Sequence, residues 1–513
     1  TVDTTKKTLV VHDGSTAGGT PLMKESGGTT NATINGVNIG KGANSASGNT
    51  ALGESALDAA VTGQNNTAIG KNALTQNTSG QGNTAVGTFT ADSITTGSFN
   101  TAIGLQSLTQ LSTGSNNTGL GQYSAALLDT GNGNTALGQA SLSSGTSCNN
   151  NTAVGQYSLR LNTTGGENVA VGYKALDGNT TASNNTAVGK EALLTNSTGT
   201  NLVAVGRGAL DANTTANDNV AVGVHSLGAN TTGASNVAIG TNALDANTTG
   251  SENTAVGKES LGANTTGNFN VSIGSFTLGA NSTGQDNAGV GTAALRLNTT
   301  GSHNSSIGSV SLYSNTSGSH NTALGKSSLR LNTSGGQNTA VGSGSLEKNT
   351  TANNNTGVGY YALNSNTTGY SNTALGYASA QDNTTGTQNT ALGYAALNNS
   401  NTANNNVAVG FESLVTNTTG SQNTAVGTNA LHNNTTAAEN NAFGYNAGYN
   451  VTTGTANVFM GNSAGDAVTT GSTNVGIGIQ ALSDDQTGSN NTAVGTFSLR
   501  DTTVSNNTAL GHS

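Results

Sequence analysis

The sequence predicts an all-β protein, a parallel β-solenoid built from 17-residue coils. The first observation is a strict repeat: the glycine that ends the phrase Asn-Thr-Ala-Val-Gly recurs every 17 residues from Gly53 to Gly495, in 27 copies without an insertion. The second is composition, with 74 Gly, one Pro and only 8% charged residues among 513. The third is that a glycine and an Asn-Thr-Thr-Gly turn interrupt every copy before a helix could form. A period kept this strictly makes each copy one coil, stacked on its neighbours.

Composition also excludes several classes of protein. Hydrophobic residues are 33% of the chain, but the high net charge and abundant Pro of disordered chains are missing. A net charge of −9 without a basic patch argues against nucleic-acid binding. The single cysteine, Cys148, excludes an intrachain disulfide framework. No apolar run approaches the length of a transmembrane helix, so we expect no membrane insertion.

The repeat divides the chain into three parts. We expect residues 1–35 to be an N-terminal β segment that acts as a cap or connector, and residues 36–48 to be a transition coil. Residues 49–513 are the solenoid, with 27 regular coils to residue 507. A terminal piece follows out of register, because Gly511 comes 16 residues after Gly495.

Each coil is numbered so that the Asn of Asn-Thr-Ala-Val-Gly is position 1 and its Gly is position 5. Positions 2 to 4 alternate like a β-strand, and we expect a second short strand that ends at the Leu of position 9. Position 4 is a large apolar residue in all 27 coils, and position 9 is Leu in 22. The sequence therefore predicts an internal column formed by positions 4 and 9, with position 2 on the same face as position 4.

Position 8 is always small, position 3 is Ala, Gly or Ser in 26 of 27 coils with Phe459 as the exception, and neither is ever charged, although this assignment turns them away from the column. A solvent-facing wall kept over 27 coils should have collected some Lys or Glu. We therefore expect this Ala/Ser wall to pack against identical chains. At about 4.8 Å per coil the stack would be roughly 130 Å long, and so thin a core favours oligomers.

The asparagine at position 1 recurs in 26 of 27 coils. Its amide is expected to bond to its own copies along the stack, as asparagine ladders do between stacked strands. Asn253, Asn270, Asn287 and Asn304 represent this ladder, to which we assign a structural role.

An aromatic stripe stands out from the periodic background. Position 6 holds Tyr360, Tyr377, Tyr394 and Phe411 in successive coils, then Thr428, then Tyr445. Stacked rings would stabilise the coils, and the same stripe could serve as a glycan-stacking platform. Nearby, we expect large side chains to enlarge the core where glycine replaces the leucine of position 9: Phe443, Phe459 and Met460 opposite Gly448 and Gly465.

No constellation for catalysis is apparent, so we expect no enzyme, no cofactor and no metal site. Glycoside hydrolysis needs two carboxylates about 5 to 9 Å apart on one surface. Asp484 and Asp485 are adjacent but lie in a turn, and the other acids are scattered. His303 and His320 occupy the same position in successive coils, which leaves a weak surface metal site as an alternative.

The phrase Asn-Thr-Ala-Val-Gly-x-x-Ser-Leu-x-x-Asn-Thr-Thr-Gly resembles the head repeats of trimeric autotransporter adhesins, which are about three residues shorter. It is also similar to Gly-Asn-Thr-Ala-rich repeats in phage and other viral tail or head fibres. The opening from Val2 to Met23 resembles a segment found in phage fibre proteins. These resemblances cover almost the whole chain, and they imply a left-handed β-roll and a parallel homotrimeric fibre.

Taken together, the sequence predicts a structural fibre shaft of a virus that supports attachment to a host cell surface. The expected partners are two further copies of the chain, a host glycan or receptor reached through the shaft or a tip, and a virion anchor protein near the N-terminus. The expected location is the virion surface or the extracellular space. A bacterial trimeric surface adhesin is the alternative. An ice-binding solenoid is a weaker one, because its threonines at position 2 are interrupted by valines and are assigned to the internal column.

Overall fold

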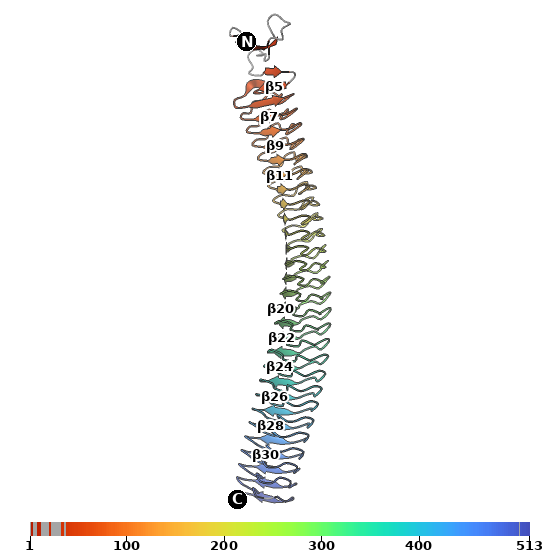
Figure 1. Ribbon diagram of the computed structural model, residues 1–513, viewed down its shortest axis with the longest axis vertical. Helices are drawn as coiled ribbons and strands as arrows, with labels where there is room; N and C mark the ends of the chain where they lie inside the picture. The colour runs from red at the N-terminus through yellow and green to blue at the C-terminus, as the bar shows by residue number, and fades with distance from the viewer. Residues whose placement is uncertain are drawn as a thin grey trace. The chain divides into compact units, whose positions relative to one another are not determined.

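The computed structural model describes residues 2–3, 8–11, 20–21, 32–34, 37–501 and 503–512, which fall into two compact units, Thr1–Glu252 and Asn253–Ser513. Each unit contains a parallel β-solenoid with one strand per 17-residue coil, 12 coils in the first and 15 in the second. The predicted β-solenoid is therefore confirmed (Figure 1).

The first unit begins with antiparallel pairs. β1 pairs with β2, β2 pairs with β3, and β4 pairs with β5. β5 then pairs antiparallel with β6 and so covers the strand edge of the first coil, as a cap does. Most of the expected N-terminal segment 1–35 lies outside the described residues. These elements are β1 (Val2–Asp3), β2 (Thr8–Val11), β3 (Thr20–Pro21), β4 (Ala32–Ile34), β5 (Val37–Gly40) and the 3-10 turn η1 (Ala43–Ser45).

From β6 onward, each strand of the first unit pairs in parallel with the next, one coil along, in an unbroken register. These strands are β6 (Thr50–Gly53), β7 (Thr67–Ile69), β8 (Thr84–Val86), β9 (Thr101–Ile103), β10 (Thr118–Leu120), β11 (Thr135–Leu137), β12 (Thr152–Val154), β13 (Val169–Val171), β14 (Thr186–Val188), β15 (Val203–Val205), β16 (Val220–Val222) and β17 (Val237–Ile239).

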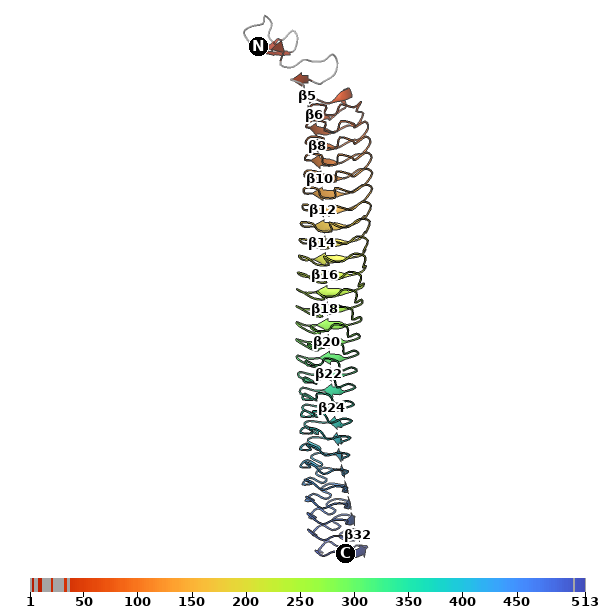
Figure 2. The same ribbon diagram turned by 90° about the vertical axis from the view of Figure 1, so that its right-hand side faces the viewer.

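The second unit repeats the same arrangement, and its strands form one ladder along one side of the coils (Figure 2). These strands are β18 (Thr254–Val256), β19 (Val271–Ile273), β20 (Ala288–Val290), β21 (Ser305–Ile307), β22 (Thr322–Leu324), β23 (Thr339–Val341), β24 (Thr356–Val358), β25 (Thr373–Leu375), β26 (Thr390–Leu392), β27 (Val407–Val409), β28 (Thr424–Val426), β29 (Asn441–Phe443), β30 (Val458–Met460), β31 (Val475–Ile477), β32 (Thr492–Val494) and β33 (Thr508–Leu510).

The expected second strand does not form. After the glycine of position 5 the chain makes turns, and residues at positions 7, 9 and 17 have left-handed backbone in nearly every coil. This alternation points successive amides to opposite neighbours: Phe276 donates to the Lys258 carbonyl of the preceding coil, whereas Leu278 donates to the Ala294 carbonyl of the following one, both at 2.9 Å. The turns thus bond between coils as a strand does, without the strand's backbone angles.

The assignment of faces is also wrong for the strand. In every strand from β6 to β32 the residue at position 3 is buried, while positions 2 and 4 are partly or largely exposed. Position 8 is buried in all 27 coils. The interior is therefore lined by positions 1, 3, 8, 9, 12 and 15, and the large apolar residues of position 4 point outward. The expected Ala/Ser wall is internal packing.

Close packing inside the coil explains why position 3 is small. A Cβ placed on Gly119, at position 3, would lie 2.5 Å from Ser107 Oγ and 3.1 Å from both Leu108 Cγ and Ser124 Oγ. The hydroxyls of position 8 and the leucine of position 9 thus leave room for Ala, Gly or Ser at position 3 and for little more.

Two successive coils solve this packing differently. Phe459 stands at position 3, is fully buried, and occupies the space that Gly448 and Gly465 leave at position 9. The expected exchange of core volume is confirmed for Phe459 alone. Phe443 and Met460, at position 4, are 37% and 46% exposed and do not enlarge the core.

Candidate binding surfaces

The asparagine ladder of position 1 is confirmed and is internal. Asn270 donates from its backbone N to Asn253 Oδ1 at 3.0 Å and from Nδ2 to the same oxygen at 3.1 Å. Asn287 and Asn304 repeat both bonds to the preceding asparagine, each at 3.1 Å. These side chains are almost completely buried, so the ladder satisfies polar groups of the core and presents nothing to a ligand.

A second asparagine column runs along position 12, where only the Asn-Thr-Thr-Gly turn was expected. Asn298 Nδ2 donates to Asn281 Oδ1 at 2.8 Å and to the Gly301 carbonyl of its own coil at 2.9 Å. Gly301 also accepts from Asn287 at 2.9 Å, so one carbonyl joins the two columns. Asn recurs at position 12, and this recurrence could have predicted a second hydrogen-bonded column for the same reason as at position 1.

The aromatic stripe is a stacked, exposed ladder in the second unit. Ring centroids lie 5.6 Å apart for Tyr360 and Tyr377, then 5.1 Å for Tyr377 and Tyr394 and for Tyr394 and Phe411. The interplanar angles are 16°, 7° and 10°, and the side chains of the stripe are 45–52% exposed. Hydrogen bonding to Tyr361, whose ring lies 4.1 Å away, raises the pKa of Tyr360.

Stacking limits what this stripe can bind. The apolar faces of rings are the surfaces on which a sugar packs, and within the ladder Tyr377 and Tyr394 use both faces on each other and on their neighbours. Only ring edges and phenol hydroxyls are left for solvent there. Phe411 differs, because its second face is directed toward the coil in which position 6 is Thr428.

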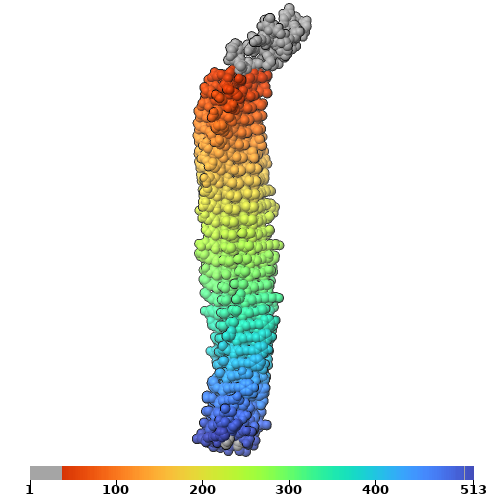
Figure 3. All heavy atoms as spheres, turned by 90° about the vertical axis from the view of Figure 1, so that its left-hand side faces the viewer, coloured from red at the N-terminus to blue at the C-terminus, as the bar shows by residue number. Residues whose placement is uncertain are grey.

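The outer strand face is the other extended surface. Position 4 places Ile273, Ile307, Leu324 and Leu375 outward in the second unit, each more than 40% exposed. Position 2 adds a parallel row, mostly of threonine with several valines. No charged residue occurs at positions 1 to 5 in any of the 27 coils, so this face combines an apolar row with a mostly threonine row and is uncharged along each unit. Figure 3 shows the coils as successive layers at the surface.

The two histidines meet as the sequence predicts. The rings of His303 and His320 stack with centroids 4.9 Å apart, and Asp286 Oδ2 lies 3.8 Å from His303 Nδ1. Parallel stacked imidazoles do not direct their nitrogens at a common point. Among the described residues no group of three His, Cys, Asp or Glu side chains is placed to hold a metal ion.

Asp484 and Asp485 do not form a pair suited to glycoside hydrolysis. Asp485 is fully buried, where it replaces the asparagine of position 12 and accepts hydrogen bonds from Gly488 N and Asn491 Nδ2 at 2.7 and 2.9 Å. Asp484 instead faces Arg500, with 3.5 Å between Oδ2 and Nε. One of the two adjacent acids is thus structural and the other belongs to an exposed ion pair.

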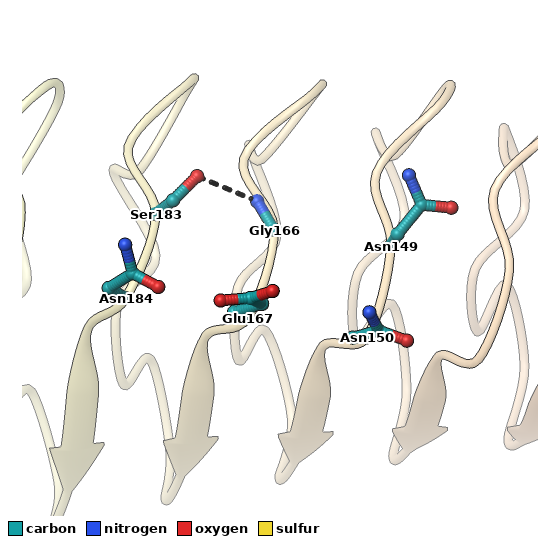
Figure 4. Close-up of a pocket in the computed structure, with 6 residues that line it drawn as sticks. All are labelled: Asn149, Asn150, Gly166, Glu167, Ser183 and Asn184. Atoms are coloured by element: carbon teal, nitrogen blue, oxygen red, sulfur yellow. Dashed lines mark hydrogen bonds between the residues drawn. The ribbon is translucent and has the colours of Figure 1, made fainter.

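A shallow polar depression lies in the first unit where position 16 is glycine (Figure 4). Its lining comes from three successive coils: Asn149, Asn150, Gly166, Glu167, Ser183 and Asn184. Gly166 N donates to Ser183 Oγ at 3.0 Å, a bond that recurs between position-16 residues in other coils. With Glu167 as its only ionisable group, the depression lacks the two carboxylates that glycoside hydrolysis requires.

A cluster of cations and tyrosines in the first unit was also not singled out from sequence. Arg160 makes a two-point ion pair with Asp177, at 2.7 and 3.1 Å, and lies 5.4 Å from the ring of Tyr157. Lys174 and Lys190 lie 5.5 and 6.0 Å from the ring centre of Tyr173. Such contacts contribute roughly 0.5–1 kcal/mol each at exposed sites, and they occupy the ring faces that a ligand would need.

Comparison with known proteins adds no family to these observations. No family model matches the chain, and no curated protein compared with it is a match. No helix among the described residues is long and apolar enough to cross a membrane.

Proposed function

We propose that the chain is a structural fibre shaft of a virus, associates as a parallel homotrimer, and supports attachment to a host cell surface. The observation that carries the proposal is the outer strand face. It carries no charge in any coil, its large apolar side chains of position 4 run beside the mostly threonine row of position 2, and it extends over about 70 Å in the second unit alone at 4.8 Å per coil. Monomeric proteins rarely expose so long a row of large apolar side chains, and identical chains are the partner that matches it coil by coil.

The internal construction supports a mechanical role. Hydrogen bonds join each coil to the next through the strand, the turns and two asparagine columns. The conspicuous chemical groups, the stacked histidines and the buried Asp485, are accounted for by packing. The shaft presents multiple weak contacts or carries a tip, and repeated weak contacts bind strongly when they act together.

Antibody labelling tests this function. Antibodies against the second unit, detected with gold in electron micrographs, are expected to decorate a projecting fibre on virus particles. Labelling of a bacterial envelope in the absence of virus would favour the alternative, a bacterial trimeric surface adhesin. Particles and cells that both remain unlabelled would contradict both proposals.

An ice-binding solenoid stays as a second candidate because of the corrected strand orientation. Threonines of position 2 point outward in a parallel ladder, instead of facing the interior as expected. Seven residues interrupt the row in the second unit: Val271, Ala288, Ser305, Val407, Asn441, Val458 and Val475. A gap between the melting and freezing temperatures of a solution of the protein would support this candidate, and coincident temperatures would reject it.

A further inference from the structure

The aromatic ladder lacks one ring. At this interruption the face of an aromatic ring is left uncovered, whereas within the ladder neighbouring rings cover both faces. Position 6 is aromatic at Phe411 and again at Tyr445, with Thr428 between them. Phe411 lies at 10° to Tyr394, so its free face is directed along the ladder toward the Thr428 coil. Phe411, Thr428 and Tyr445 are all exposed. We call the gap above Thr428, between the side chains of Phe411 and Tyr445, the missing rung.

The spacing at the missing rung fits one more ring. Neighbouring rungs are 5.1 Å apart, so Phe411 and Tyr445 are separated by about 10 Å over two steps. A six-membered ring placed midway would lie about 5 Å from each aromatic ring, within the usual 4.5–7 Å of ring contacts. A single inserted ring would therefore use the face of Phe411 on one side and the Tyr445 side chain on the other.

Polar side chains border the missing rung where it meets the coils. Thr428 is exposed, and its hydroxyl makes no hydrogen bond with any residue that the structure describes. The next position carries Glu412, Asn429 and Asn446 in the same three coils, with Asn429 Nδ2 bonded to Asn446 Oδ1 at 3.2 Å. One carboxylate oxygen of Glu412, Oε2, lies 3.6 Å from His432 Nε2, and the side chain remains partly exposed. Side chains of this position lie beside the rungs, as the 4.1 Å contact of Tyr361 with Tyr360 shows.

We propose that the missing rung binds one hexopyranose unit of a glycan, held between Phe411 and Tyr445 above Thr428. The apolar C–H faces of a pyranose pack on aromatic rings, and its hydroxyls around the ring edge suit the Thr428 hydroxyl and the Glu412 carboxylate. An apolar aromatic ligand would use the rings but leave these polar groups unmatched. The inference rests on the proposed attachment function and names its ligand class and place on the shaft.

The test uses the full chain and saturation-transfer NMR with methyl pyranosides of glucose, galactose, mannose and N-acetylglucosamine. Irradiation of the protein's aromatic protons is expected to transfer saturation to the C–H protons of at least one pyranoside. Thr428→Tyr should abolish this transfer, because the new ring completes the ladder and fills the position. The variant should fold, since tyrosine already occupies this position three times in the ladder.

Matched controls make the result decisive. Thr292→Tyr introduces the same side chain at position 6, between Ser275 and Ser309, and should leave the transfer unchanged. Phe411→Ala should weaken binding about tenfold, as expected for loss of one stacking face. Equal transfer in Thr428→Tyr and the parent chain, or no transfer to any pyranoside, would overturn the inference. Gold labelling of particles is independent of this result. The proposal of an attachment fibre can therefore be correct even if the missing rung binds no pyranose.

Discussion

The leucine of position 9 is buried with a left-handed backbone, as in Leu312, whose φ is 48°. Left-handed backbone is especially unfavourable for β-branched residues, and none occupies position 9 although Val and Ile fill position 4. We expect Leu312→Ile to reduce the free energy of unfolding by about 2–4 kcal/mol, more than the usual cost of an isomeric core exchange. Leu324→Ile, the same change in a strand, should be nearly neutral in urea denaturation. Equal effects would show that the backbone angle does not select leucine.

Cys148 replaces the buried glycine of position 15, beside Gly145 at position 12, and its Sγ takes the space of the missing asparagine. Burial raises the pKa of its thiol from 9.0 to about 11. Because the unfolded thiol ionises first, the resulting stability is complete below pH 9 and is lost as the pH rises toward 11. Relative to Cys148→Ala, the free energy of unfolding should fall by about 2–3 kcal/mol over this interval. Parallel pH profiles of the two proteins in urea denaturation would contradict this.

Core volume is conserved between neighbouring coils, and Phe459 allows a direct test. Phe459→Ala should leave a cavity and reduce the free energy of unfolding by about 3–5 kcal/mol. Adding Gly448→Leu and Gly465→Leu restores the side chains found in other coils and should recover most of this loss. Thermal unfolding of the single and triple variants measures both effects. A triple variant no more stable than Phe459→Ala would show that the three residues do not compensate one another.

The period, the stacked coils and the ladders of Asn270 and Tyr377 could be predicted, because stacking places identical residues beside each other. Which face of the strand points to the interior could not be predicted. Alternation shows that Ala255 and Val256 point to opposite sides, but not which side is inside, and the larger apolar residue was the natural choice. Packing decides otherwise, because Leu261 and the side chains of position 8 already fill a narrow interior.

For the molecule as a whole, self-association through the outer strand face is the property to measure. Light scattering after size exclusion should give a mass near three times the 50.3 kDa chain. Leu375→Glu with Leu392→Glu places two charges on the outer face and should yield single chains, because burying an unpaired charge is costly. Thr292→Glu with Ser309→Glu adds the same charge at position 6 and should leave the mass unchanged. A parent chain of 50.3 kDa would contradict the trimer.

The bonding between coils has a consequence for how such a gene can change. Leu278 and Phe276 find their partners 16 and 18 residues away, and the asparagine columns find theirs at 17. Loss or gain of 17 codons, or of a multiple of 17, therefore leaves every remaining residue with an equivalent neighbour. Unequal recombination between copies can thus lengthen or shorten a unit in steps of about 4.8 Å without a new folding problem. Reach becomes a trait that selection can adjust one coil at a time.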